Sequence, residues 1–275
     1  MLVCRIRFHR HSNHLKKNTH YCSDKGATAE AITEAHTHLR EFLFKLCAEF
    51  KEAAGIPPPV ATEFEKYLLI AHTLAMKAQH GRLGLKQLHA RACMSLLRFT
   101  ADIAVDQAFH DAGQACRDVG WHSNAFVYFN RFVDLCDLID APEANNDMEN
   151  SDFAATDIPS PFDVPLPARP AYDAAAREEV REWVVDQAIS NEANAQALVT
   201  RPCEKCSKQV AEATITCPHC RHEHTPCIVT GFPVPKHSRV ACKTCKLSAS
   251  KDDWNTFVVK TKVCPWCGTQ ANAVY

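Results

Sequence analysis

The 275-residue sequence has little glycine, almost no net charge and no long apolar run. Its eight glycines form no cluster that could cradle a phosphate, and the formal net charge of −1 supplies no basic field for nucleic acid or an acidic membrane. No stretch reaches the roughly 18 apolar residues of a membrane span. Residues 1–10 carry charges throughout and lack the apolar core of a signal peptide. These absences predict a cytoplasmic chain with reduced thiols.

Cysteine is the abundant residue, and its distribution is uneven. Nine of the 15 cysteines follow residue 200, and eight of these form four Cys-x-x-Cys pairs: Cys203/Cys206, Cys217/Cys220, Cys242/Cys245 and Cys264/Cys267. In a reducing compartment such pairs indicate metal binding rather than disulfides. Two pairs complete a closed tetrahedral zinc site that leaves no position for substrate. The sequence therefore predicts two structural Zn²⁺ ions and no catalytic residue.

The spacing leaves two ways of grouping the pairs. Sequential grouping joins the first pair with the second and the third with the fourth, whereas a RING cross-brace joins alternate pairs. We favour sequential grouping because 21 residues separate Cys220 from Cys242, which is long for a RING. With eight cysteines available, we expect the nearby histidines to lie on the surface: His219, His222, His224 and His237. Cys227 is unpaired in the sequence, and we expect it in the core.

Residues 27–140 have the apolar periodicity of successive helices, without a strand signal. Glycines and prolines divide them into predicted helices at 27–54, 60–79, 85–101, 105–119 and 123–139. In the last pair, Gly113 and Ala115 precede Gly120 and the aromatic Phe129. That order resembles a tetratricopeptide repeat, in which small residues let two helices approach closely. An ordinary helical hairpin is the alternative.

The other regions differ in composition. We expect residues 1–26, which are basic and rich in histidine, to be unstructured or a mis-annotated start, with a nucleic-acid-binding or targeting tail as the alternative. Residues 141–171 are acidic and rich in proline, which predicts a solvated linker. A bridging helix over 172–198, with Asp173 as candidate N-cap, leads to the zinc module at 201–275.

The expected fold is therefore mainly α: a tetratricopeptide-like helical solenoid segment followed by a small zinc-binding α+β module of zinc-ribbon or U-box-like form.

Four segments together point to a family. They share an order and spacing over about 150 residues, and they comprise residues 120–135, residues 150–167, residues 177–184, and residues 226–234 with 252–255. This arrangement resembles the C-terminal end of the intraflagellar transport protein 172 family. The family's members are large scaffold subunits of the peripheral part of the intraflagellar transport B complex, with two β-propellers before a long helical solenoid. The resemblance implies a C-terminal fragment, a split gene or a truncated gene model.

The resemblance also implies a function. We expect a non-enzymatic scaffold that binds other subunits of the intraflagellar transport A and B complexes and supports cilium assembly and train turnaround. The expected location is the cilium or flagellum and its base, within the cytoplasm. We expect no nucleic-acid partner, because the basic residues of the module are accompanied by few aromatic residues for base stacking.

The family's end also resembles a U-box, the metal-free relative of the RING. Residues 227–231 correspond to its first loop, Trp254 to its helix and residues 264–267 to its second loop. The chain departs from a U-box by carrying cysteine pairs where a U-box uses hydrogen bonds. This likeness implies an alternative function, a ubiquitin-binding or ubiquitin ligase element that holds ubiquitin or a ubiquitin-conjugating enzyme. Its candidate partner-binding residues are Ile228, Trp254, Pro265 and Trp266.

Overall fold

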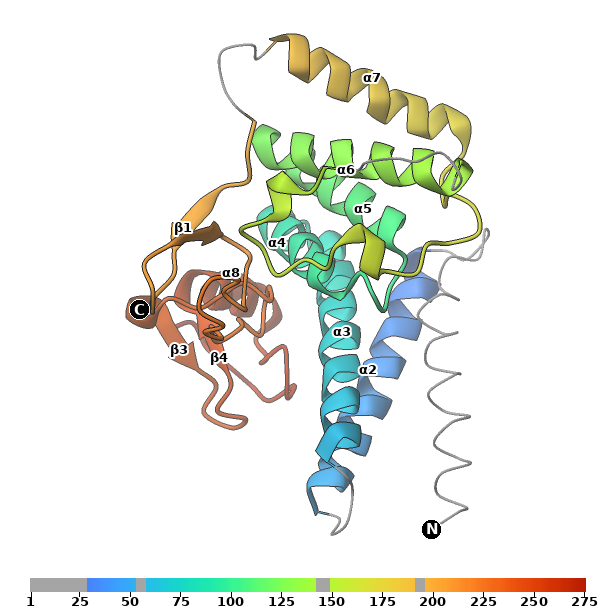
Figure 1. Cartoon of the computed structure of the whole chain (residues 1–275). Helices are drawn as coiled ribbons and strands as arrows, with labels where there is room; N and C mark the ends of the chain where they lie inside the picture. Colours follow the sequence, from blue (N-terminus) through green and yellow to red (C-terminus); the bar gives the residue numbers. More distant parts are fainter. Residues whose placement is uncertain (1–28, 53–57, 142–148, 191–195) are drawn as a thin grey trace.

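The computed structural model describes residues 29–52, 58–141, 149–190 and 196–275. Six α-helices form its larger part (Figure 1): α2 (Ala29–Glu52), α3 (Pro58–Arg82), α4 (Lys86–Leu96), α5 (Val105–Asp118), α6 (His122–Asp140) and α7 (Ala174–Ser190). They occur in the predicted order. Most ends shift by a few residues. Helix α3 begins at Pro58 and Pro59, which were expected to precede it. Proline suits the first turn of a helix, where its missing N–H would have no partner within the helix. The predicted head at 1–26 lies outside the described residues.

Each helix packs on the next one in the chain, from α2 on α3 through to α6 on α7. Short connections between α3 and α6 make neighbours antiparallel, and their inward faces share one apolar core. Among its fully buried side chains are Leu43, Ile70, Leu97, Phe129 and Phe132. The prediction of a mainly helical region of stacked helices is confirmed.

The α5–α6 pair shows why small residues are needed where helices meet. A Cβ atom on Gly113 would lie 2.5 Å from the Cδ1 atom of Phe129, which is fully buried on α6. Gly120 forms the turn between the two helices with a φ of +78°, a backbone conformation that glycine adopts without strain. Both glycines thus have the roles that the sequence pattern predicts.

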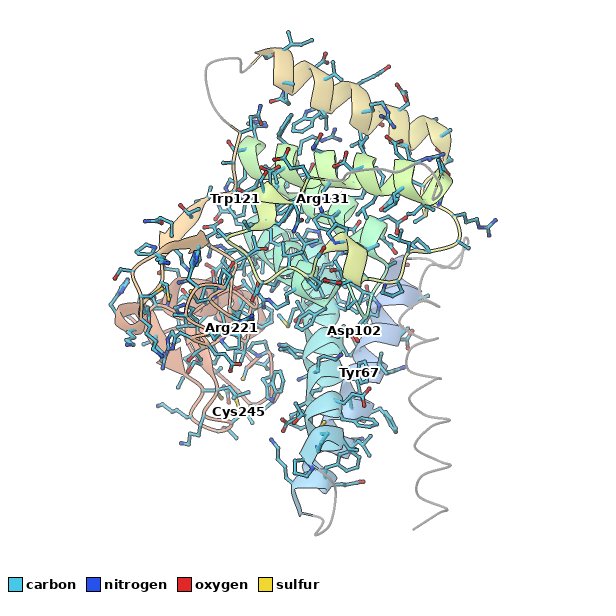
Figure 2. All side chains as sticks on the ribbon, viewed as in Figure 1. Tyr67, Asp102, Trp121, Arg131, Arg221 and Cys245 are labelled. Atoms are coloured by element: carbon cyan, nitrogen blue, oxygen red, sulfur yellow. The ribbon has the colours of Figure 1, made fainter. Side chains whose placement is uncertain are left out.

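The acidic segment packs on the helices where it is described, from residue 149 to 173. It forms only two short 3₁₀ turns, Ser151–Phe153 and Pro161–Asp163, yet the side chains of Phe153 and Val164 are buried. The guanidinium of Arg131 on α6 (labelled in Figure 2) lies 4.5 Å from the centre of the Phe153 ring. It donates hydrogen bonds to the carbonyl of Glu149 and to Oδ1 of Asn150. A solvated linker was therefore the wrong expectation for this stretch.

Helix α7 follows and covers α6. The backbone N–H of Ala176 donates to Oδ1 of Asp173 at 2.9 Å, so Asp173 caps the helix as predicted. The ring of Trp183 packs on Phe129 with centroids 5.3 Å apart, and Arg181 forms an ion pair with Asp137 of α6. These contacts attach the outermost helix to the stack.

The C-terminal module has little regular structure. It comprises two antiparallel two-stranded sheets and one helix: β1 (Thr200–Pro202) with β2 (Gln209–Ala211), β3 (Arg239–Ala241) with β4 (Ser248–Ser250), and α8 (Lys251–Thr261). Figure 1 shows it beside the helical stack. Its combination of short strands and one helix confirms the predicted fold class, including two four-cysteine clusters.

Candidate metal centres

The first cluster lies at the tip of the β1–β2 hairpin and in the hairpin that follows. Cys203 and Cys206 form one knuckle, and Cys217 and Cys220 form the other. The Sγ atoms of Cys203 and Cys220 are 3.8 Å apart, as are those of Cys206 and Cys217. Four thiols therefore converge on one point.

The second cluster repeats this arrangement around β3, β4 and the chain after α8. It joins Cys242 and Cys245 with Cys264 and Cys267. Its Sγ atoms are 3.8 Å apart between Cys242 and Cys267 and 3.9 Å apart between Cys245 and Cys264. The pairs are thus grouped sequentially, and the cross-brace alternative does not describe this chain.

All four knuckles share one backbone conformation. In each, the N–H of the fourth residue after the first cysteine donates to that cysteine's carbonyl, as Ser207 does to Cys203 at 2.9 Å. That fourth residue has a positive φ in every knuckle: Ser207, Arg221, Lys246 and Gly268. In three of the knuckles this residue is not glycine. Its left-handed backbone conformation then costs about 1 kcal/mol or more of conformational free energy. Metal coordination is the interaction expected to offset that cost.

The sulfur geometry fits zinc. Four zinc–sulfur bonds of about 2.3 Å in a regular tetrahedron place the sulfurs about 3.8 Å apart. Two sulfur pairs in each cluster lie 3.8 or 3.9 Å apart, and all four sulfurs of a cluster lie within 4.8 Å of one another. A disulfide needs sulfurs about 2.05 Å apart, and all eight cysteines are free. Each cluster offers four ligands and no open position, so the arrangement suits a structural ion.

The thiols of the first cluster differ in acidity. Burial raises the pKa of Cys203, but hydrogen bonds from the backbone N–H groups of Cys206 and Lys205 outweigh it and lower that pKa to about 5. At Cys220 the N–H of His222 lowers the pKa, but burial and the neighbouring thiols outweigh it and raise the pKa to about 12. Four thiolates repel one another at this distance, and a divalent cation removes that repulsion.

The histidines near the cysteine pairs differ in how far they are buried. His219 and His237 are exposed, as predicted, whereas His224 is buried and the surface prediction is wrong for it. His224 lies with His222 and Glu204 in a third group of close ligand atoms. The cations of Arg201 and Lys236 lie 3.5 Å from His224 and 3.6 Å from Glu204, which disfavours a further cation there.

Cys227 belongs to the core of the module, as predicted. Its side chain is buried, and its thiol lies 3.6 Å from Oδ2 of Asp253. The same carboxylate accepts a hydrogen bond from Thr230 at 2.9 Å and forms an ion pair with Arg91 of α4 at 2.6 Å. Asp253 therefore ties residues 227–230 both to α8 and to the helical stack.

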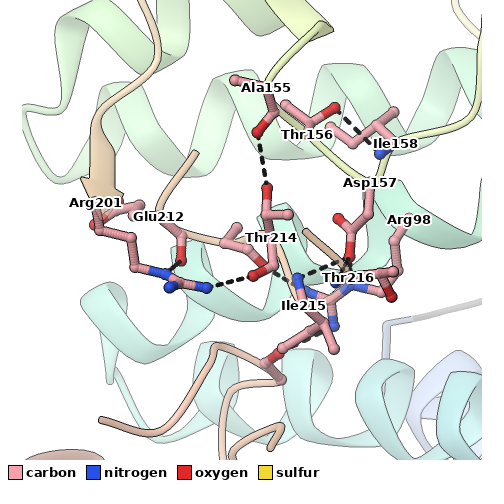
Figure 3. A network of polar contacts seen from close by, with 12 residues as sticks. Arg98, Ala155, Thr156, Asp157, Ile158, Arg201, Glu212, Thr214, Ile215 and Thr216 are labelled. Atoms are coloured by element: carbon pink, nitrogen blue, oxygen red, sulfur yellow. Dashed lines mark hydrogen bonds and ion pairs between the residues drawn. The ribbon is translucent and has the colours of Figure 1, made fainter. Parts of the chain in front are cut away.

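A second arginine of the helical stack, Arg98, attaches the first centre to the stack. Arg98, just after α4, donates to the carbonyls of Gly231 and Ala213 at 3.0 and 2.7 Å. Asp157, from the acidic segment, accepts hydrogen bonds from the N–H groups of Ile215 and Thr216 (Figure 3). Since Thr216 precedes Cys217, this network holds the second knuckle of the centre against the helices.

The structure places the four partner-binding candidates against the chain itself. Ile228 and Trp254 are buried, and Pro265 and Trp266 are half-buried. The carbonyls of Pro265 and Trp266 accept hydrogen bonds from Arg40 of α2. Sequence reasoning missed Arg40, Arg98 and Asp157, since nothing in their local spacing marks them as contacts of residues more than 50 positions away.

These features define a class: a stack of helices that ends in a small module with two closed four-cysteine centres. No family model matches the chain. It is 35% identical over 247 residues to intraflagellar transport protein 172 of Chlamydomonas reinhardtii and 34% identical over 252 residues to the Homo sapiens homolog, alignments that cover 88% and 90% of this chain. It is also 32% identical over 208 residues, 73% of this chain, to the Caenorhabditis elegans protein osm-1.

The chain is homologous to a segment of intraflagellar transport protein 172. It spans 14% of the length of the first two relatives and 11% of the third. The helices in the described part of the chain are all too short or too polar to cross a membrane.

Proposed function

We propose that this chain is a non-enzymatic scaffold element of intraflagellar transport. The observation that carries the proposal is its identity of about 35% to intraflagellar transport protein 172 over nearly nine-tenths of its length. Because the chain spans only 14% of those relatives, the proposal concerns the role of this segment: we infer that it is the C-terminal interaction region of such a subunit.

The architecture supports a role in binding other proteins. Stacked helices present an extended surface, and closed metal centres make a small module rigid without offering a catalytic position. On α7, the side chains of Val185 and Ile189 are 50% and 65% exposed, one helical turn apart. The proposed partners are other subunits of the A and B complexes, at the cilium or flagellum and its cytoplasmic base, with a role in cilium assembly and train turnaround.

We propose further that the eight paired cysteines hold two structural zinc ions. The first ion is held by Cys203, Cys206, Cys217 and Cys220, and the second by Cys242, Cys245, Cys264 and Cys267. The ions supply folding free energy to a module whose strands are only three residues long. Zinc thus maintains the surface that the scaffold offers, and takes no part in a reaction.

Localisation in ciliated cells tests the proposed function. The tagged chain is expected to concentrate at the base and along the cilium and to co-purify with other transport subunits. A variant in which Cys217 and Cys242 are both replaced by serine, one in each centre, should lose this association. Replacement of the exposed His219 and His237 is the control and should leave it intact. An even cytosolic distribution of the unaltered chain, without transport subunits, would contradict the proposal.

A further inference from the structure

Helix α2 makes direct contact with a knuckle of the second metal centre. The guanidinium of Arg40 donates through Nη2 to the carbonyl of Pro265 at 3.3 Å and to that of Trp266. These are the two residues between Cys264 and Cys267, so one side chain of the helical stack holds the backbone that spaces two of the four thiols.

A hydrogen-bond chain continues from Arg40 into α3 and the core of the module. Nε of Arg40 donates to Nδ1 of His72 at 3.2 Å, which leaves the proton of the neutral imidazole on Nε2. Nε2 then donates to the carbonyl of Ile228 at 2.7 Å. Burial lowers the pKa of His72 to about 3, so the neutral form that this chain of bonds requires persists at physiological pH.

Aromatic packing fixes the same contact. The ring of Trp266 lies 4.6 Å from the ring of His72 and 6.3 Å from that of Phe44, measured between centroids. Helices α2 and α3 therefore enclose the Cys264–Cys267 knuckle from one side, with a cation, an imidazole and an aromatic ring.

Each centre has an arginine beside it that donates to backbone carbonyls, and the two arginines come from different parts of the chain. A zinc ion with four thiolates has a net charge of −2, and a neighbouring arginine offsets part of that charge. At the first centre this arginine is Arg201 of β1, which is held within the module by the carbonyls of Glu212 and Thr214 at 3.2 and 2.6 Å. At the second centre it is Arg40, more than 200 residues away in sequence.

We propose that Arg40 is a positioning residue for the second metal centre, and that metal binding there and docking of α2 stabilise each other. The proposal rests on the zinc occupancy proposed above. Metal organises the knuckle whose carbonyls Arg40 binds, and Arg40 in turn supplies charge and hydrogen bonds to the loaded centre. Such coupling is reciprocal: each event strengthens the other by the same factor. The first centre, with its own arginine, is independent of α2.

The test uses the full chain with both zinc ions bound. Zinc release to a chromogenic chelator is followed together with hydrogen exchange of peptides from the two centres, which identifies the centre that opens. For Arg40→Gln, we expect release from the second centre to accelerate at least tenfold while release from the first centre stays at the wild-type rate. Arg40→Lys keeps the charge but not the forked donor. Its rate of zinc release from the second centre should therefore lie between those of wild type and Arg40→Gln. Lys51→Gln removes an exposed charge from the same helix and serves as control.

The reciprocal measurement is hydrogen exchange in α2. Removing zinc from the wild-type chain should increase exchange around Arg40 severalfold, and in Arg40→Gln the same treatment should change it little. Equal acceleration at both centres, or wild-type release from the second centre of a folded Arg40→Gln chain, would overturn the proposal. A wild-type chain that binds no zinc would overturn the proposed metal centres themselves, a distinct result seen before any variant is made.

Discussion

Gly113 lies where α5 meets the buried ring of Phe129 on α6. A Cβ atom at this position would lie only 2.5 to 2.8 Å from the nearest ring atoms, which leaves no room for a methyl group. The ring is itself enclosed by Trp183 and His110, so it cannot easily move aside. Gly81 in α3 is different, because a Cβ there would meet its nearest neighbour, His89, at 3.4 Å, an ordinary contact.

The substitution Gly113→Ala should therefore destabilise the helical stack by about 1–3 kcal/mol, the typical cost of overpacking. Gly81→Ala should leave the free energy of unfolding unchanged or raise it by up to about 1 kcal/mol, since alanine loses less backbone entropy on folding. Urea denaturation followed by circular dichroism measures both. Equal stability of the two variants would show that the α5–α6 contact is looser than described.

The roles of some single residues could be predicted from the sequence, and those of others could not. The four Cys-x-x-Cys pairs and the small residues Gly113 and Gly120 were predicted because their signals are local: a knuckle or helical turn needs those residue types at that spacing. The burial of His224 was not predicted. Histidine occurs on many surfaces, and only its pairing with Ile215 across a hairpin places it inside.

Helices α3 and α8 meet at a buried histidine. His80 is fully buried, and its ring packs on Phe257 of α8 with centroids 5.7 Å apart. Burial, together with His89 of α4, lowers the pKa of His80 from 6.5 to about 3. The folded chain thus keeps this imidazole neutral while the unfolded chain protonates it below pH 6.5. The corresponding stability is present above pH 6.5 and is lost as the pH falls towards 3.

Replacing His80 by leucine should remove this pH dependence. Between pH 7.5 and pH 5.5, we expect the wild-type free energy of unfolding to fall by about 1 kcal/mol more than that of His80→Leu, because only the wild-type unfolded state gains this proton. Denaturation at the two pH values measures the difference. His237→Leu makes the same replacement at an exposed position and serves as the control. Parallel slopes for wild type and His80→Leu would contradict a neutral buried His80.

At the scale of elements, apolar periodicity predicted helices α2 to α7, but not the packed form of residues 149–173. Acidic residues and prolines indicate a solvated chain, and that inference ignores side chains supplied by other elements. Here Arg131 of α6 covers the Phe153 ring, and Asp106 of α5 accepts a hydrogen bond from the backbone of Ala171. Hydrogen bonds and ring contacts between residues this far apart in the sequence leave no pattern in the neighbouring residues from which they could be predicted.

At the scale of the whole molecule, the helices and the module form one connected structure. Arg40, Arg98 and Arg91 each reach from the helical stack to the module, where they bind backbone carbonyls or the buried carboxylate of Asp253. Composition separates the two parts clearly, but it does not reveal that they share an interface. The structure adds that the surface predicted to receive a partner, around Ile228 and Trp266, is occupied by α2 and α3.

The two four-cysteine clusters are proposed to hold two closed tetrahedral zinc centres. Metal analysis combined with zinc X-ray absorption tests this proposal most directly: we expect two zinc ions per chain, each with four sulfur neighbours at about 2.3 Å. Cys217→Ser should reduce the stoichiometry to one tightly bound ion, whereas Cys227→Ser, which changes a buried thiol outside both clusters, should retain two. Fewer than two ions in the wild-type chain, or nitrogen or oxygen ligands in either shell, would contradict the account.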